Sequence, residues 1–114
     1  MLIEFNAYVS PDEDLIVFTS YGRSDDLGSG DLYFSRKDSL GRWTNSKNLG
    51  KDVNSTALDY CPYLDVETGI FYFTSERFPS ETQEFTIVTE FVGYADDVYN
   101  GLGNILRINA DVIF

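Results

Sequence analysis

The chain has 114 residues and a mass of 12.9 kDa, which is the size of one small domain. Its 8 Lys and Arg against 19 Asp and Glu give a net charge of −11, which disfavours nucleic acids and anionic lipid surfaces as partners. The chain has no histidine, so catalytic triads with a histidine base are excluded. An aromatic content of 16% favours strands over helices, so we expect an all-β fold.

The sequence predicts neither an export signal nor a membrane span. Residues 1–5 lack the basic start and the long apolar run of a signal peptide, and no later window approaches about 18 apolar residues. The single cysteine, Cys61, precedes Pro62 in an apolar setting and is predicted to be a buried thiol.

An internal repeat organises the chain. Residues 7–20 align with residues 62–75, and both segments share a Tyr, an apolar residue, a turn and an apolar run that ends in Phe-Thr-Ser. Phe73 aligns with Phe18, an offset of 55 residues. Arg23 and Arg77 follow the two copies at similar distances, so we expect two copies of one structural unit.

The first unit is predicted to contain four short strands. Pro11 presets φ for a hairpin turn at 10–14. The expected order is a strand at 8–9, the turn at 10–14, a buried strand at 15–20, a Gly-rich loop at 21–30, a strand at 31–35, a turn at 36–41, a short strand at 42–44 and a polar connection at 45–57. Four strands in about fifty residues are typical of an antiparallel propeller blade.

The second unit is predicted to carry an insertion. Residues 103–108 echo the strand at 31–35 after a stretch about eighteen residues longer than in the first unit. This insertion, 78–102, contains a β-branched and aromatic run at 84–92 that predicts one extra strand.

Several motif positions carry a resemblance to a known family. They are Ser10, Pro11, Asp12, Phe18, Asp31, Tyr33, Trp43, Asn48, Gly50 and Asn54. In order and spacing over residues 5–77 they resemble the WD40-like PD40 β-propeller repeat of TolB-like proteins. The second copy departs from this pattern, with Asp65-Val66-Glu67 in place of Ser-Pro-Asp.

The resemblance implies a partial β-propeller made of about two four-stranded blades within one unit, 1–114. Blade one covers about 5–57 and blade two about 58–114, with the insertion 78–102. Bacterial proteins of this family are commonly exported, so the resemblance also implies a periplasmic or cell-envelope location.

Two blades are fewer than the four to eight that close a propeller, so apolar faces and strand edges need a cover. Three solutions follow. The chain is part of a longer propeller, it self-associates into a ring as a homo-oligomer, or the insertion 78–102 folds over an open face.

The repeat motif is predicted to be mainly structural. Leu15 and Val17 are expected to face the adjacent blade, and Asp31 to accept hydrogen bonds from the backbone of a neighbouring turn. Trp43 lies on the motif and is expected to pack. Large apolar contacts are assigned to Phe18, Phe34, Phe71 and Phe73.

Two groups of residues are candidate sites. Asp25, Asp26 and Asp31 offer closely spaced oxygens for a hard cation, although their spacing does not fit an EF-hand and a solvated loop is the favoured interpretation. Exposed aromatics for a protein or a sugar are expected at Tyr21, Tyr94 and Tyr99.

The functional hypothesis is a non-enzymatic interaction module that binds a protein partner or further propeller blades, without a cofactor and without catalytic residues. The alternative is a carbohydrate-binding or glycan-processing propeller fragment, because propellers host such enzymes and paired carboxylates can cleave glycosides. The acidic composition predicts a basic or neutral surface on the partner.

Overall fold

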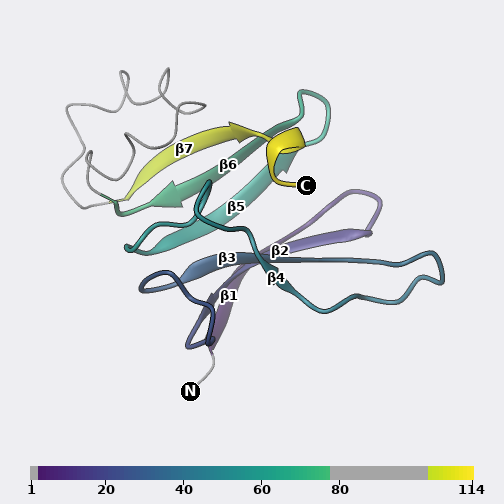
Figure 1. Cartoon of the computed structure of the whole chain (residues 1–114). Helices are drawn as coiled ribbons and strands as arrows, with labels where there is room; N and C mark the ends of the chain where they lie inside the picture. The colour runs from purple at the N-terminus through teal and green to yellow at the C-terminus, as the bar shows by residue number, and fades with distance from the viewer. Residues whose placement is uncertain (1–2, 78–102) are drawn as a thin grey trace.

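The computed structural model describes residues 3–77 and 103–114, which form two antiparallel β-sheets (Figure 1). The first sheet has the order β1-β2-β3-β4, and the second has the order β5-β6-β7. The strands are β1 (Ile3–Val9), β2 (Leu15–Tyr21), β3 (Asp31–Arg36), β4 (Lys47–Asn48), β5 (Asp59–Asp65), β6 (Ile70–Ser75) and β7 (Asn104–Asn109). A short 3-10 helix, Ala110–Val112, follows β7. The expected all-β, antiparallel class is confirmed.

The two sheets repeat the same strand register. β2 pairs with β3 from Leu15↔Arg36 to Ser20↔Asp31, and β6 pairs with β7 from Ile70↔Asn109 to Ser75↔Asn104. Each of these ladders has six pairs, and their ends on β2 and β6 lie 55 residues apart. The sequence repeat is therefore also a repeat of strand pairing.

A backbone irregularity recurs in the first strand of each sheet. The pairing of β1 with β2 shifts between Phe5 and Tyr8, and that of β5 with β6 shifts between Tyr60 and Tyr63. The bulges place Asn6 and Cys61 in the left-handed region, both with φ of 51°. Cys61 is exposed, so the prediction of a buried thiol is wrong. A bulge interrupts the alternation of inward and outward side chains.

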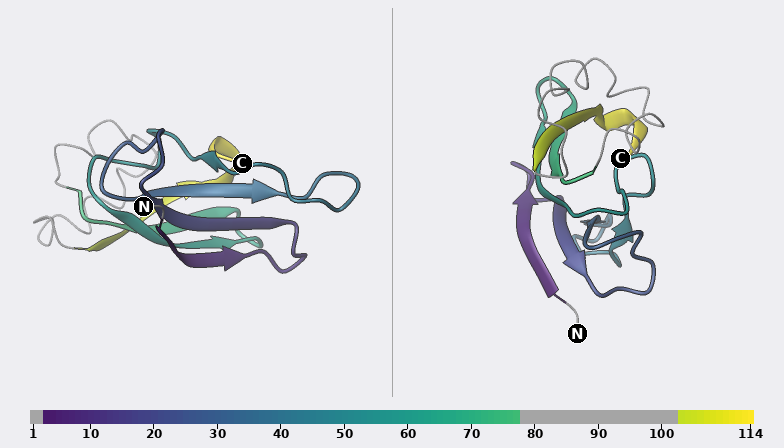
Figure 2. Two further views of the ribbon diagram at one scale, coloured as in Figure 1. Left: turned by 90° about the horizontal axis from the view of Figure 1, so that it is seen from below. Right: turned by 90° about the vertical axis from the view of Figure 1, so that its left-hand side faces the viewer.

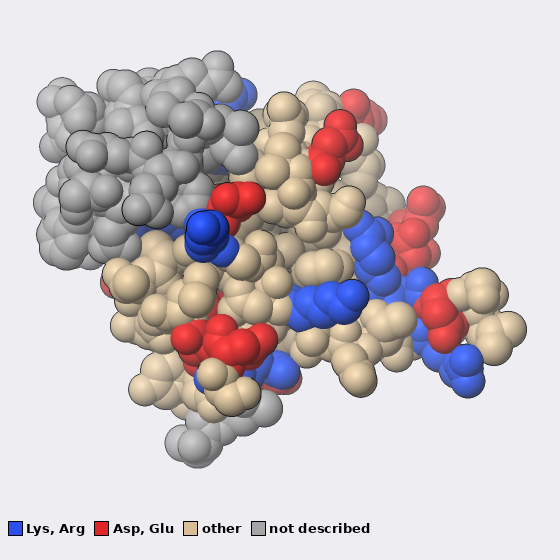
Figure 3. Space-filling view, viewed as in Figure 1, with Lys and Arg blue, Asp and Glu red and all other residues tan. Residues whose placement is uncertain are grey.

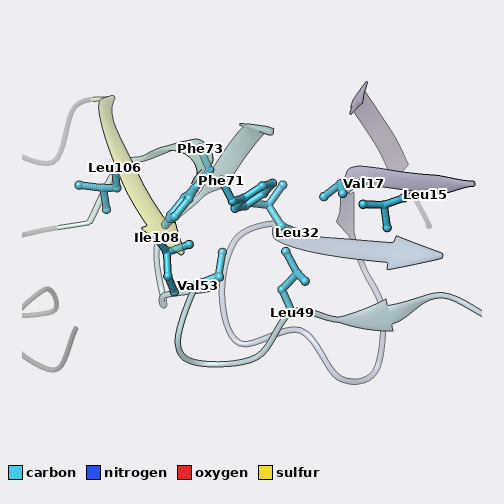
Figure 4. Close-up of a cluster of buried hydrophobic side chains, with 9 residues drawn as sticks. All are labelled: Leu15, Val17, Leu32, Leu49, Val53, Phe71, Phe73, Leu106 and Ile108. Atoms are coloured by element: carbon cyan, nitrogen blue, oxygen red, sulfur yellow. The ribbon is translucent and has the colours of Figure 1, made fainter. Parts of the chain in front are cut away.

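The two sheets stack face to face around one apolar core (Figures 2 and 4). β5 packs against β1 and β2. The core residues are Leu15, Val17, Leu32, Leu49, Val53, Phe71, Phe73, Leu106 and Ile108. Leu15 and Val17 do face the second sheet, as predicted, and Phe71 and Phe73 do fill the core. Phe18 and Phe34 are only half-buried.

The fourth strand lies later in the chain than predicted. Strand pairing occurs at Lys47–Asn48 instead of 42–44, whereas Trp43 makes one isolated bridge with Lys37. Trp43 remains 47% exposed, with the Lys37 ammonium over its ring, so it packs on the hairpin and lies outside the core. The loop between β3 and β4 extends beyond the stacked sheets (Figure 2).

The second sheet has three strands in the described part of the chain, where four were expected. The predicted strand at 84–92 and the rest of the insertion 78–102 lie outside the described residues. Residues 3–77 and 103–114 form no closed barrel or propeller.

Candidate protein-binding groove

Repeat-motif side chains form a hydrogen-bond network that holds the segment after β4 on β3. The Asn54 amide accepts from the Leu32 N–H at 2.7 Å and donates to the Leu32 carbonyl at 2.9 Å. It also donates to Oδ1 of Asn48, which accepts from the Gly50 N–H. Nδ2 of Asn48 donates to the Asp31 carboxylate at 2.9 Å. This network supports the structural role predicted for these positions.

Asp31 lies at the start of β3 with its carboxylate fully buried. Its Oδ2 accepts a hydrogen bond from the Leu27 N–H at 2.5 Å. This is a contact with the backbone of a neighbouring turn, as predicted. Burial raises the pKa of Asp31, and the hydrogen bonds from Leu27 and Asn48 only partly offset this rise. Asp31 therefore acts inside the scaffold.

Asp25 and Asp26 make hydrogen bonds that stabilise the loop between β2 and β3. Both carboxylates accept the Tyr33 hydroxyl, at 2.8 and 2.6 Å, and burial raises the pKa of that phenol. Asp26 also accepts the N–H groups of Gly22 and Arg23. Across residues 3–77 and 103–114, no group of three His, Cys, Asp or Glu side chains is arranged to hold a metal ion. Asp25, Asp26 and Asp31 are thus not brought together around one point.

Two arginines occupy corresponding places in the sheets. The Arg23 guanidinium lies over the Tyr33 ring and forms an ion pair with Glu4 at 2.5 Å. Arg77 pairs with Asp59 at 3.0 Å and also donates to the Val53 carbonyl. Burial raises the pKa of Asp59, an effect that Arg77 opposes. The repeat alignment signalled both arginines but not their acidic partners.

The predicted aromatic contacts are only partly described. Tyr21 ends β2 and is 47% exposed. Tyr94 and Tyr99 lie outside the described residues. The described exposed aromatics also include Tyr63, on β5, which the sequence interpretation did not select.

The strongest candidate site is a groove where two hairpin turns meet the C-terminal 3-10 helix. In the β1–β2 turn, Oγ of Ser10 accepts the N–H groups of Asp14 and Leu15. In the β5–β6 turn, Asp65 occupies the corresponding position and accepts two backbone N–H groups. The Ala110 N–H donates to the Gly69 carbonyl and fixes the helix beside that turn.

The groove is lined by apolar residues and by carboxylates. Two adjoining recesses of about 400 and 450 Å³ share Pro11, Leu64 and Val66. Leu15 and Phe114 line the 400 Å³ recess and connect its apolar surface with the core. The carboxylates that line the recesses are Asp12, Asp14, Asp65, Glu67 and Asp111.

One basic side chain, Arg36, lines this groove among the described residues. Its guanidinium lies 5.9 Å from the Phe34 ring centroid and 5.6 Å from that of Phe114. Arg36 begins a basic hairpin, since residues 36–47 contain four Lys or Arg and one Asp. Figure 3 shows basic side chains gathered near β3 and β4, so the groove, with its five carboxylates, differs in charge from the neighbouring hairpin.

Sequence reasoning missed this groove. It treated Ser10, Pro11 and Asp12 only as turn residues, and the structure places Pro11 and Asp12 also on the groove wall. The available signal was the repeat itself, because equivalent turns of stacked sheets end at the same side of the molecule.

No helix in the described part of the chain is long and apolar enough to cross a membrane. Comparisons with protein-family models, with curated proteins and with solved structures give no match.

Proposed function

We propose that the chain is a non-enzymatic, β-propeller-type repeat module whose groove binds a protein partner. The two stacked sheets correspond to the two blades, and further blades would extend the same stack. The observation that carries the binding role is the groove lining, in which Pro11, Leu64 and Val66 lie among five carboxylates. The motif side chains Asp31, Asn48 and Asn54 are engaged in internal hydrogen bonds, which supports a scaffold role for the motif.

The chemistry of the groove favours a basic peptide segment with an apolar anchor. An aliphatic or aromatic side chain would contact Leu64, Val66 and Phe114, while neighbouring Lys or Arg side chains would face Asp12 and Asp111. Charge complementarity of this kind increases association rates and excludes acidic partners.

Binding of a fluorescent peptide set tests this function. The set holds apolar-anchored peptides with flanking Lys, flanking Glu or no charge, and the readout is fluorescence anisotropy at two salt concentrations. We expect the Lys peptides to bind and their affinity to fall with salt. The double variant Asp12→Asn, Asp111→Asn should weaken binding about tenfold, as loss of roughly 1.4 kcal/mol implies.

The matched control is Leu40→Lys, because Leu40 is 72% exposed in the β3–β4 hairpin and does not line the groove. Equal peptide affinities for the wild type and the Asp12, Asp111 variant would contradict the proposal. Binding of free oligosaccharides, with no binding of any peptide in the set, would contradict it as well. That result would favour the carbohydrate-binding alternative.

A further inference from the structure

The two sheets contact each other through opposite faces. Residues paired across neighbouring strands share a face of the sheet. By the observed registers, the first sheet uses the face of Val17 and Leu32, whereas the second uses the face of Phe71 and Leu106. The contact is therefore head-to-tail, and each sheet has a second face that this contact does not use.

We infer that the unused face of the β5–β7 sheet binds the unused face of the β1–β4 sheet in a second copy of this chain. Apart from Tyr63 and Val9, which also line the 450 Å³ recess of the groove, the surfaces involved lie outside the groove, and their assignment follows from the internal repeat. Because both sheets share one strand register, the contact seen within the chain defines the geometry of the contact between copies.

The exposed face of the second sheet corresponds to the buried face of the first. Leu32 pairs with Thr19 and is fully buried in the core. At the equivalent place in the second sheet, Ile105 pairs with Thr74 and is 56% exposed. A second copy would cover Ile105 as the second sheet covers Leu32.

The complementary face belongs to the first sheet. Phe71 and Phe73, which are buried in the core, have Ile16 and Phe18 as their equivalents. Ile16 and Phe18 are only half-buried. Two apolar side chains of this face are therefore incompletely covered by the described residues.

A tyrosine hydrogen bond fixes how the two sheets are aligned where they meet. The Tyr8 hydroxyl donates to the Leu64 carbonyl at 2.9 Å, and the Tyr8 and Tyr63 rings meet edge to face at 5.5 Å. Tyr63 is the equivalent of Tyr8, and Val9 is the equivalent of Leu64. Between copies, the Tyr63 hydroxyl would donate to the Val9 carbonyl. Tyr63 and Val9 are 56% and 48% exposed.

The two equivalent ion pairs also differ in burial, as the apolar residues of the two sheets do. The Asp59 and Arg77 side chains are fully buried, whereas Glu4 and Arg23, their equivalents, are 48% and 23% exposed. Among residues 3–77 and 103–114, no sheet covers this face of the first sheet as the first sheet covers the equivalent face of the second.

A head-to-tail contact forms a closed ring when its rotation permits and an open filament when it does not. Under the proposed propeller-type arrangement, rings of four to eight blades need about two to four copies of a two-sheet chain. This number rests on the proposed function, whereas the contact itself does not.

Sedimentation velocity with the full chain tests the inference over a concentration series. We expect a species of about two to four times the 12.9 kDa chain mass. Ile105→Lys should abolish it, and Tyr63→Phe should weaken association about fivefold through loss of one hydrogen bond. Leu40→Lys should leave it unchanged, and circular dichroism establishes that each variant folds. A monomer at every concentration, or equal effects of Ile105→Lys and Leu40→Lys, would overturn the inference.

A mixing experiment tests the head-to-tail geometry. Ile105→Lys disrupts one half of the interface and Ile16→Lys the other, so each variant alone should be a monomer. Their mixture should form a dimer with one copy of each, because the two intact halves are complementary. No dimer in the mixture would overturn the geometry. Peptide binding by the Ile105→Lys monomer reports on the groove separately.

Discussion

The Asp59 carboxylate lies 3.0 Å from the Arg77 guanidinium, and both side chains are fully buried. We expect Asp59→Asn to lower the free energy of unfolding by about 3 to 5 kcal/mol, because it leaves the arginine charge buried without its carboxylate. Urea unfolding followed by circular dichroism measures this loss.

The matched control for that change is Glu4→Gln, at the equivalent position in the first sheet. Its ion pair with Arg23 is exposed to solvent, so we expect a loss of at most about 1 kcal/mol. Equal losses for the two variants would show that burial does not distinguish the pairs.

Asn54→Asp tests the motif network. The aspartate keeps an acceptor for the Leu32 N–H but places a carboxylate against the Leu32 carbonyl, where the wild-type amide donates. We expect a loss of about 1 to 3 kcal/mol of stability, since the Leu32 carbonyl and Oδ1 of Asn48 each lose one of two donors and face a carboxylate in its place. Asn45→Asp, at an exposed position, is the control and should change stability by no more than about 0.5 kcal/mol. The urea unfolding midpoints of both variants measure these losses, and equal midpoints would contradict the role of the network.

Gly28→Ala tests the packing of the β2–β3 loop on the segment after β4. A Cβ at position 28 would lie 2.2 Å from the Thr56 carbonyl oxygen, so the backbone must move. We expect a loss of about 1 to 3 kcal/mol. Ser29→Ala, at the exposed neighbouring residue, should have little effect in the same thermal unfolding assay. A Gly28→Ala midpoint equal to that of the wild type would refute the close contact.

The pH dependence of stability should change in opposite directions in two variants. Burial raises the folded-state pKa of Asp31, so its contribution to stability is full below the usual pKa of 3.8 and is lost as pH rises through the folded pKa. The Arg42 N–H lowers the pKa of Asp38, so that contribution is present above 3.8 and is lost as pH falls through the folded pKa.

Asp31→Asn should therefore make the slope of unfolding free energy against pH more positive, and Asp38→Asn should make it less positive. Urea unfolding at several values between about pH 3 and 7 measures both slopes. Slopes unchanged from the wild type would contradict the two assignments.

Local signals in the sequence predicted much of the first sheet. Pro11 and its neighbours indicated the first hairpin turn, and the apolar run at 15–20 indicated β2. The role of Asp31 also followed from its place at the start of a strand next to a Gly-rich loop. In each case the determining residues lie close together in the chain.

Features that depend on distant contacts were not predictable in this way. β4 lies at Lys47–Asn48 because Asn48 bonds to Asp31 and Leu49 enters the core, and neither contact is visible in local composition. The groove was missed for the same reason. Its walls come from two turns and a helix that adjoin only after the sheets stack.

The paired bulges at Asn6 and Cys61 show which property the two sheets share. Both residues have φ of 51°, a conformation that asparagine tolerates and cysteine adopts less readily. The backbone shape is thus common to both copies although the side chain differs. One practical consequence concerns spectroscopy. Cys61 is the chain's single thiol and lies on the surface, so a spin label or fluorophore attached there would report on the second sheet without entering the core.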